Sequence, residues 1–205
     1  MKQFAYLLGA ALIIATLLFF VFSNEEDAVR NYPSAGTDIL AFGDSLVQGV
    51  GAIDGNDFVS LLSKKIDRPI VNLGVSGDTT AQGLARIGEL DRYHPKVVLL
   101  LLGGNDHLRK VPIQETFANL GAIIENIQQR GAIVLLLGIR GSLLGDQFEA
   151  EFEKLHEQHK SAYVSDVLSG IFGHGELMSD SIHPNNLGYA KIAERIYPVL
   201  LPLLQ

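Results

Sequence analysis

The sequence predicts an α/β/α sandwich built on a parallel sheet. Apolar runs such as Val97–Leu102 and Ala132–Ile139 lack the alternation of half-exposed strands, so they suit strands that helices cover on both faces. These runs alternate with amphipathic stretches across short connections, which is typical of parallel strands joined by crossover helices. The chain has 205 residues, and the roughly 175 that follow the first thirty are enough for one domain with a sizeable core.

The expected elements follow one another as strand and helix in turn. The expected strands are Asp38–Phe42, Ile70–Leu73, Val97–Leu102, Ala132–Ile139 and Ala162–Val164. The expected helices are Phe58–Ile66, Thr80–Tyr93, Ile113–Gln129, Gln147–His159 and Leu187–Tyr197. In the third helix, apolar residues recur at spacings of three and four, as one buried stripe requires. These residues are Phe117, Leu120, Ile124 and Ile127.

A separate apolar segment, Phe4–Phe22, precedes these elements and carries no charge over 19 residues. As a helix rising about 1.5 Å per residue, it would match a bilayer's hydrocarbon thickness of about 30 Å. Lys2 before it and the acidic residues after it predict that the rest of the chain lies outside the cytoplasm. A cleaved signal peptide is the alternative, although its apolar stretch is normally shorter and no A-x-A pattern closes this one.

We therefore expect a transmembrane anchor or signal peptide over residues 1–23, a polar linker over 24–36, and one folded domain over 37–205. The domain would face the periplasm from the inner membrane, or be released into the periplasm after cleavage. The net charge of −7 and pI near 5.3 argue against nucleic acid as a partner. The absence of cysteine excludes disulfides, thiolate metal sites and cysteine nucleophiles.

Three polar turns that contain glycine and follow strands, together with a fourth polar turn near the C-terminus, are the candidate functional segments, because ligands of open α/β sheets bind beyond the carboxyl ends of the strands. The turns are Gly43–Ser45, Gly74–Thr79, Gly103–Asp106 and Asp180–Asn186. In the first turn, within "AFGDSLVQG", Ser45 is either a cap of the next helix or a nucleophile.

A nucleophilic serine needs a base and an acid that orients the base. Asp180 and His183 have the spacing D-x-x-H, which lets the carboxylate reach one imidazole nitrogen and leaves the other for Ser45. An acyl-transfer site also needs oxyanion donors, and the candidates are the backbone N–H groups of Ser45 and Gly77 and the amide of Asn105. Each turn alone is more often a structural cap, a loop or a solvated surface pair. The four turns together favour catalysis.

The blocks "FGDSLVQG", "NLGVSGDTTAQGLARI", "LLGGNDHLR" and "DSIHPNNLGYAKIA" resemble the four blocks of the SGNH, or GDSL, hydrolases. The resemblance covers residues 37–197 and is strongest to the bacterial thioesterase, lysophospholipase and arylesterase branch. It implies a flavodoxin-like sandwich of five parallel strands that hydrolyses esters or thioesters without a metal or organic cofactor. It also implies Ser45, Asp180 and His183 as the triad, with Ser45, Gly77 and Asn105 as oxyanion donors.

One departure concerns the segment after the fourth strand, where relatives carry an N-Y-G element and this chain has "GIRGSLLGDQFEAEF". Residues 141–147 are expected to face the substrate, so the acyl-chain preference does not transfer. Two other functions stay open: a carbohydrate or cell-envelope O-acetylesterase, and a catalytically silent, membrane-tethered binding domain. Asp78 and Asp106 are expected to shape loops. A metal site at His156 and His159 is disfavoured because the surrounding residues are charged and no third ligand is near in sequence.

Overall fold

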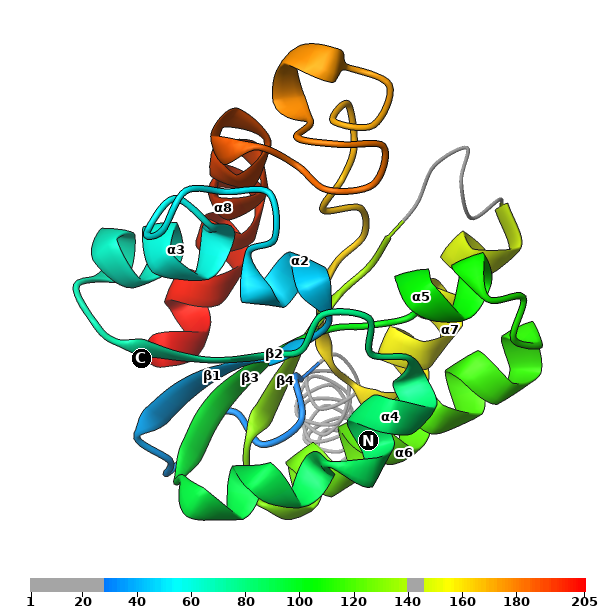
Figure 1. The fold of residues 1–205 in the computed structure, drawn as a ribbon. Helices are drawn as coiled ribbons and strands as arrows, with labels where there is room; N and C mark the ends of the chain where they lie inside the picture. Colours follow the sequence, from blue (N-terminus) through cyan, green and yellow to red (C-terminus); the bar gives the residue numbers. More distant parts are fainter. Residues whose placement is uncertain (1–27, 140–145) are drawn as a thin grey trace, which may run out of the picture.

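The computed structural model of the protein describes residues 28–139 and 146–205. Five parallel strands form one sheet with the order β2-β1-β3-β4-β5 (Figure 1). The strands are β1 (Asp38–Gly43), β2 (Ile70–Gly74), β3 (Pro95–Leu101), β4 (Ile133–Leu137) and β5 (Ala162–Val164). The predicted five-stranded parallel sheet is therefore confirmed.

Helices cover both faces of this sheet (Figure 1). The α-helices are α2 (Ser45–Gln48), α3 (Phe58–Ile66), α4 (Thr80–Ala85), α5 (Gly104–Leu108), α6 (Ile113–Gln129), α7 (Asp146–His159) and α8 (Asn186–Leu200). Short 3-10 helices span Ile87–Arg92, Gly175–Leu177 and Leu201–Leu204. Helices α3 and α8 pack against each other, whereas α6 packs against both α4 and α7. The result is the three-layer arrangement that the sequence predicts.

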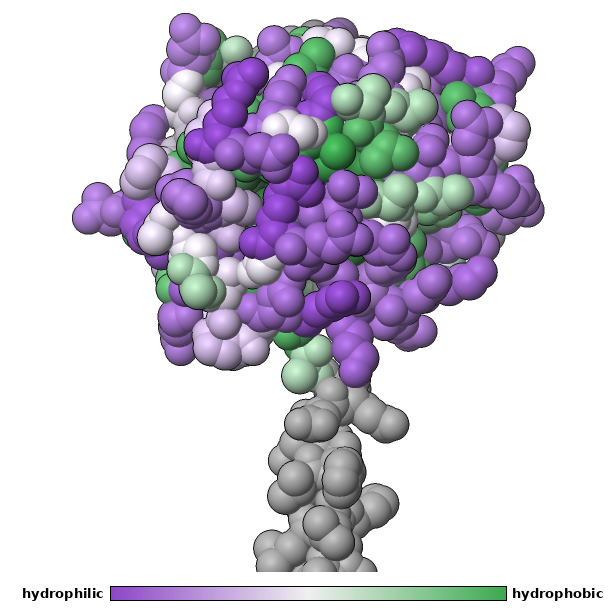
Figure 2. Space-filling view, turned by 90° about the horizontal axis from the view of Figure 1, so that it is seen from below, coloured by the Kyte–Doolittle hydropathy of each residue, from purple (hydrophilic) through white to green (hydrophobic). Residues whose placement is uncertain are grey.

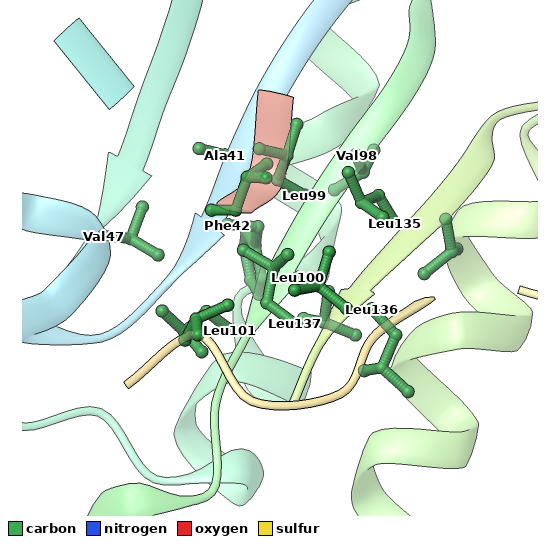
Figure 3. Close-up of a cluster of buried hydrophobic side chains, with 14 of the residues drawn as sticks. Ala41, Phe42, Val47, Val98, Leu99, Leu100, Leu101, Leu135, Leu136 and Leu137 are labelled. Atoms are coloured by element: carbon green, nitrogen blue, oxygen red, sulfur yellow. The ribbon is translucent and has the colours of Figure 1, made fainter. Parts of the chain in front are cut away.

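The core lies where the central strands meet the helices (Figure 3). Strand β4 is buried along its whole length, and Val98, Leu99 and Leu100 of β3 are fully buried. These runs have no exposed face, which explains why their sequences lack alternation. Figure 2 views the molecule from below and shows that hydrophilic side chains cover most of this face, with smaller hydrophobic patches among them.

Two glycines bring the helix that follows β1 against the strand ends. A Cβ at Gly43 would lie 2.2 Å from the carbonyl oxygen of Leu101, and one at Gly74 would lie 2.2 Å from the backbone nitrogen of Gln48. Any larger residue would push α2 away from β1 and β2. The close approach therefore fixes where Ser45, the first residue of α2, emerges from the sheet.

The structure differs from the sequence predictions in its short helices. Helix α2 begins at Ser45, where the sequence predicts a helix start, whereas α5 occupies a segment expected as a turn. Each is only four or five residues long, too short for a periodic apolar pattern. The helix expected over Thr80–Tyr93 is two elements, because Arg86 leaves the helical range with φ −105° and ψ 12°. The third and fourth strands begin or end a few residues away from the predicted bounds.

Residues 28–36 are bound to the domain at the amino ends of the strands. The backbone N–H of Arg30 donates to the carbonyl oxygen of Lys160, just before β5, over 2.8 Å. Asn31 Nδ2 donates to the carbonyl oxygens of Gln128 and Ala132, just before β4. Across residues 28–139 and 146–205, none of the helices has the length and apolarity needed to cross a bilayer. The apolar segment Phe4–Phe22 lies outside the described residues.

Candidate active site

Three side chains that are distant in sequence form one hydrogen-bonded row. Ser45 Oγ lies 3.1 Å from His183 Nε2, and His183 Nδ1 lies 2.7 Å from Asp180 Oδ2. Ser45 follows β1 directly, whereas the other two residues come from the loop before α8. The row has the geometry that lets an imidazole take a proton from a hydroxyl while a carboxylate holds its other nitrogen.

The carboxylate of Asp180 is held in the acceptor role that this row needs. Its Oδ1 accepts from the backbone N–H groups of Ile182 and His183, each at 2.8 Å. The hydrogen bond from the His183 side chain, aided by these two N–H groups, lowers the pKa of Asp180 to about 2. Asp180 is therefore ionised at neutral pH and accepts from Nδ1–H of His183. This tautomer leaves Nε2 free to accept the proton of Ser45.

Hydrogen bonds before and after His183 hold the loop that carries it. Met178 and Pro184 form an isolated antiparallel bridge, and Ser179 N donates to the carbonyl oxygen of His183 over 2.8 Å. Asn185 caps α8 by accepting from the first backbone N–H groups of that helix, and its amide nitrogen donates to the carbonyl oxygen of Glu176. The imidazole thus stands on a constrained turn at the start of a helix.

Two backbone N–H groups near Ser45 have no acceptor within the described part of the chain. Ser45 N–H is the first of α2, where no helical carbonyl precedes it, and Gly77 N–H lies in the loop after β2. The third candidate donor, Asn105 Nδ2, donates to the carbonyl oxygen of Asp78 over 3.0 Å and lies 3.4 Å from Asp44 Oδ2. Asn105 therefore links the loop of Gly77 to the segment that carries Ser45.

A small apolar pocket of about 60 Å³ opens beside Ser45. Asn105 and His183 line it together with Ser45, whereas Gly77 does not. Its apolar walls are Leu46, Leu108, Ile139, Leu168, Phe172 and Ile182. Larger hollows lie between α6 and α7 and at the amino ends of β1 and β3, away from Ser45 and His183. The pocket beside Ser45 is the candidate active site because convergent polar groups meet an apolar wall there.

Sequence reasoning missed the wall contributed by Leu168 and Phe172. These residues lie in the irregular segment after β5, where "DVLSGIFG" has no helical or strand period. The segment contains two glycines with positive φ, Gly170 and Gly173, and the structure bends it back over the carboxyl end of the sheet. Its apolar residues were the only signal available. Of the expected substrate-facing segment, 141–147, residues 141–145 lie outside the described residues, and 146–147 begin α7.

Asp44 lies immediately before Ser45, and only 2% of its surface is exposed to solvent. Burial raises the pKa of its carboxyl from the ordinary 3.8 to about 7, against the opposing effect of the hydrogen bond from Leu46 N. The nearby carboxylates of Asp78 and Asp106 also raise this pKa, whereas His183 lowers it. The role as a helix cap that the sequence allows is present, since Oδ1 accepts from Leu46 N over 3.0 Å.

The other two acids hold the loops around the site. Asp78 pairs with Arg86 over 2.6 Å, and Arg86 also donates to the carbonyl oxygen of Gly43 over 2.9 Å. Asp106 is fully buried and accepts from both the backbone and the hydroxyl of Thr80. These pairings fit the loop-shaping role expected from the sequence.

His156 and His159, the two histidines considered as a metal site, make other contacts. His156 stacks on Tyr163 with ring centroids 4.6 Å apart, and His159 is buried near the C-terminal end of α7. Within residues 28–139 and 146–205, no group of three or more histidine and acidic side chains could hold a metal ion.

The family model for GDSL-like lipases and acylhydrolases matches residues 41–191. The chain belongs to this family. It is 32% identical to Esterase TesA of Pseudomonas aeruginosa over 206 residues, covering 95% of this chain and 99% of the relative. It is also 32% identical to Thioesterase 1/protease 1/lysophospholipase L1 of Escherichia coli strain K12, covering 83% of this chain and 86% of the relative.

The fold of this family member is shared with solved structures. A crystal structure of TesA superimposes with a TM-score of 0.77 and 33% identity, covering 82% of this chain and all of that chain. The resemblance inferred from the four sequence blocks is thereby confirmed, and so is the prediction of an ester hydrolase.

Proposed function

We propose that this GDSL-family esterase cleaves its substrate by acyl transfer to Ser45. His183 takes the hydroxyl proton as Ser45 Oγ attacks the acyl carbonyl, and ionised Asp180 stabilises the imidazolium that forms. The tetrahedral intermediate collapses as His183 donates the proton to the leaving oxygen or sulfur. Water, activated by His183, then attacks the acyl-enzyme and releases the acid. The observation that carries the proposal is the row from Asp180 through His183 to Ser45, at 2.7 and 3.1 Å.

The negative oxygen of each tetrahedral intermediate would be stabilised by three donors. Ser45 N–H and Gly77 N–H have no acceptor in the described part of the chain, which supports their assignment as oxyanion donors. The amide of Asn105 would be the third donor. Removing one such donor typically lowers the rate by about a hundred- to a thousandfold.

The proposed substrates are carboxylic esters and thioesters, with an acyl group in the apolar pocket beside Ser45. The names of the relatives, an esterase and a thioesterase/lysophospholipase, support this substrate class. The walls formed by Leu168 and Phe172 support a hydrocarbon acyl group over a charged one. No metal or organic cofactor enters the proposed reaction, because the described residues themselves supply the nucleophile, the base and the oxyanion donors.

Labelling with a fluorophosphonate and a panel of p-nitrophenyl esters from C2 to C16 tests this proposal. We expect Ser45 to carry the label and Ser45→Ala to lose ester hydrolysis. An unchanged rate in Ser45→Ala would refute the mechanism. Activity confined to acetate, with acetylated glycans accepted, would move the substrate class to the cell-envelope O-acetylesterases.

For the location of the chain, we propose that Phe4–Phe22 anchors it in the inner membrane, with the domain in the periplasm. Because Arg30 and Asn31 are bound at the amino ends of the strands, the tether would join the domain at the end opposite the pocket. The pocket would then face away from the anchoring membrane and favour substrates that diffuse to it. Carbonate extraction of membranes shows whether the chain is membrane-bound, and the mass of the mature chain shows whether residues 1–23 are retained. A soluble chain that lacks the first 23 residues would refute the anchor.

A further inference from the structure

The proposed donor Gly77 lies in a turn that is closed by the hydrogen bond from Asp78 N–H to the carbonyl oxygen of Val75, over 3.2 Å. Its φ of +84° lies in the left-handed region, and it belongs to the loop between β2 and α4. The turn bond does not involve the 76–77 peptide that carries the Gly77 N–H, and glycine has the widest conformational range of all residues, so the direction of this N–H also depends on contacts from outside the turn. A donor that stabilises an oxyanion must be fixed before the reaction, because reorganisation during the reaction would cost the stabilisation it provides.

Contacts from the surrounding elements fix both neighbours of Gly77. Gln48 Oε1, at the end of α2, accepts from the backbone N–H of Ser76 over 2.9 Å. On the other side, Asp78 accepts at its carbonyl oxygen from Asn105 Nδ2 over 3.0 Å. These bonds hold the loop to the helices that carry Ser45 and Asn105, but none of them reaches Gly77.

Arg109 makes the hydrogen bond to Gly77 itself. Its Nη2 donates to the carbonyl oxygen of Gly77 over 2.7 Å, the single hydrogen bond to this residue among residues 28–139 and 146–205. Its Nη1 lies 3.3 Å from Gln82 Oε1, which also accepts from the backbone N–H of Thr79 over 3.0 Å. The guanidinium thus spans the loop from Gly77 to the first turn of α4, and charge-assisted bonds of this length are among the strong ones.

Arg109 and Asn105 come from the same turn of α5. The backbone N–H of Arg109 donates to the carbonyl oxygen of Asn105 over 3.0 Å, so the two residues stand four apart on one face of the helix. Their side chains bind the successive carbonyls of Gly77 and Asp78. Helix α5 and the residue that caps its C-terminal end therefore set the position of the Gly77 carbonyl relative to the amide of Asn105.

We infer that Arg109 is a positioning residue that holds the Gly77 N–H as an oxyanion donor, an inference that rests on the proposed function. Arg109 acts through the Gly77 carbonyl and does not touch the reacting atoms. Because this hydrogen bond is exposed, water can take the place of Arg109 at the Gly77 carbonyl, and no buried group is left without a partner. The Gly77 N–H belongs to the preceding 76–77 peptide, which is joined to this carbonyl through the φ and ψ angles of Gly77. Loss of the bond would loosen both angles, and the donor would then spend only part of its time in the position that the oxyanion needs.

Arg68 offers a matched control. It is also an arginine whose Nη2 donates to a backbone carbonyl, that of Thr37, over 3.0 Å. Thr37 precedes β1 at the amino end of the sheet, so this bond lies at the opposite end from Ser45. Arg68→Met removes the same charge and the same type of hydrogen bond as Arg109→Met, without touching the loop of Gly77.

The experiment compares Arg109→Met, Arg109→Lys and Arg68→Met with wild type. The measurements are kcat and KM for p-nitrophenyl acetate, and inhibition by ethylboronic acid, which adds to a serine hydroxyl as a tetrahedral anion. For Arg109→Met we expect kcat to fall about tenfold with KM changed less than twofold, because misplacing a donor costs less than removing one. The inhibition constant of the boronic acid should rise by the same factor. Arg109→Lys should recover most of kcat, and Arg68→Met should match wild type.

Three results would overturn the inference: kcat of Arg109→Met within twofold of wild type, a rise in KM alone, or an equal loss in Arg68→Met. A thermal melt by circular dichroism accompanies each variant, and Arg109→Gln replaces Arg109→Met if the latter does not fold. Failure of the proposed function is a separate outcome, because it would be seen as full activity in Ser45→Ala. A dead Ser45→Ala with an unaffected Arg109→Met would refute the positioning role alone.

Discussion

Replacing Asp44 by asparagine should remove a pH-dependent loss of stability. Burial raises the pKa of this carboxyl to about 7 in the folded chain, against an ordinary value of 3.8. Between these values the folded chain keeps a proton that the unfolded chain has released, so stability at this site falls as pH rises. The loss begins near pH 4 and is complete above pH 7. In Asp44→Asn the side chain stays neutral and keeps an oxygen for the Leu46 N–H, so this loss should be absent.

The pKa difference sets the size of the effect. At about 1.36 kcal/mol per pKa unit, the ionised carboxylate costs the fold about 4 kcal/mol above pH 7, of which about 3 kcal/mol appears between pH 5 and pH 8. The free energy of unfolding of Asp44→Asn, minus that of wild type, should therefore rise by about 3 kcal/mol over this range. The asparagine amide adds a constant offset beside Asn105, so the slope is the quantity to test and not the offset.

Urea unfolding at pH 5, 6, 7 and 8, followed by circular dichroism, measures this slope. Titrations of groups that do not interact with Asp44 are common to both proteins and cancel in the difference, whereas those of Asp78, Asp106 and His183 are coupled to Asp44 and do not. A carbon-13 titration of the Asp44 carboxyl in Ser45→Ala gives the pKa directly. Parallel stability profiles for the two proteins across this range would refute the reasoning, because they would mean that Asp44 is not held neutral by its burial.

Three further outcomes are expected. Asp180→Asn should lower kcat for p-nitrophenyl esters by about a hundredfold or more, with little change in KM. The reason is that an amide cannot hold the His183 tautomer that leaves Nε2 free. Equal kcat values in the variant and wild type would exclude Asp180 as the residue that orients His183. Leu100→Ala should lower the free energy of unfolding in urea by about 2–5 kcal/mol, because the Leu100 side chain is fully buried in the central strand. A decrease below about 1 kcal/mol would show that neighbouring side chains fill the space that Leu100 leaves. Gly188→Ala should lower the free energy of unfolding by about 1–3 kcal/mol, because its Cβ would lie 2.3 Å from the carbonyl oxygen of Leu177. A melting temperature equal to that of wild type would contradict this close packing.

The parts of the fold that could be predicted are those with a long apolar signal. Helices α3 and α6 begin and end at the predicted residues. Asp57 caps α3, and one apolar stripe marks α6, which has no side-chain cap. Helix α5 has five residues and begins after Gly103 without a side-chain cap, so its sequence differs little from that of a turn. The pocket wall at Leu168 and Phe172 also escaped prediction, because a segment without regular structure is placed by tertiary contacts alone.

The site residues could be proposed because of the place of β1 in the sheet. From β1 the chain crosses to β2 on one side and then to β3 on the other, so β1 lies beside the point where the strand order reverses. The turns after β2, β1 and β3 carry Gly77, Ser45 and Asn105, so three segments far apart in sequence must meet at one edge. His183 follows no strand directly, and its approach to Ser45 depends on the bridge between Met178 and Pro184. The topology thus places the proposed nucleophile and donors, whereas the proposed base depends on a loop. Substitutions in that loop should therefore impair proton transfer before they impair the fold.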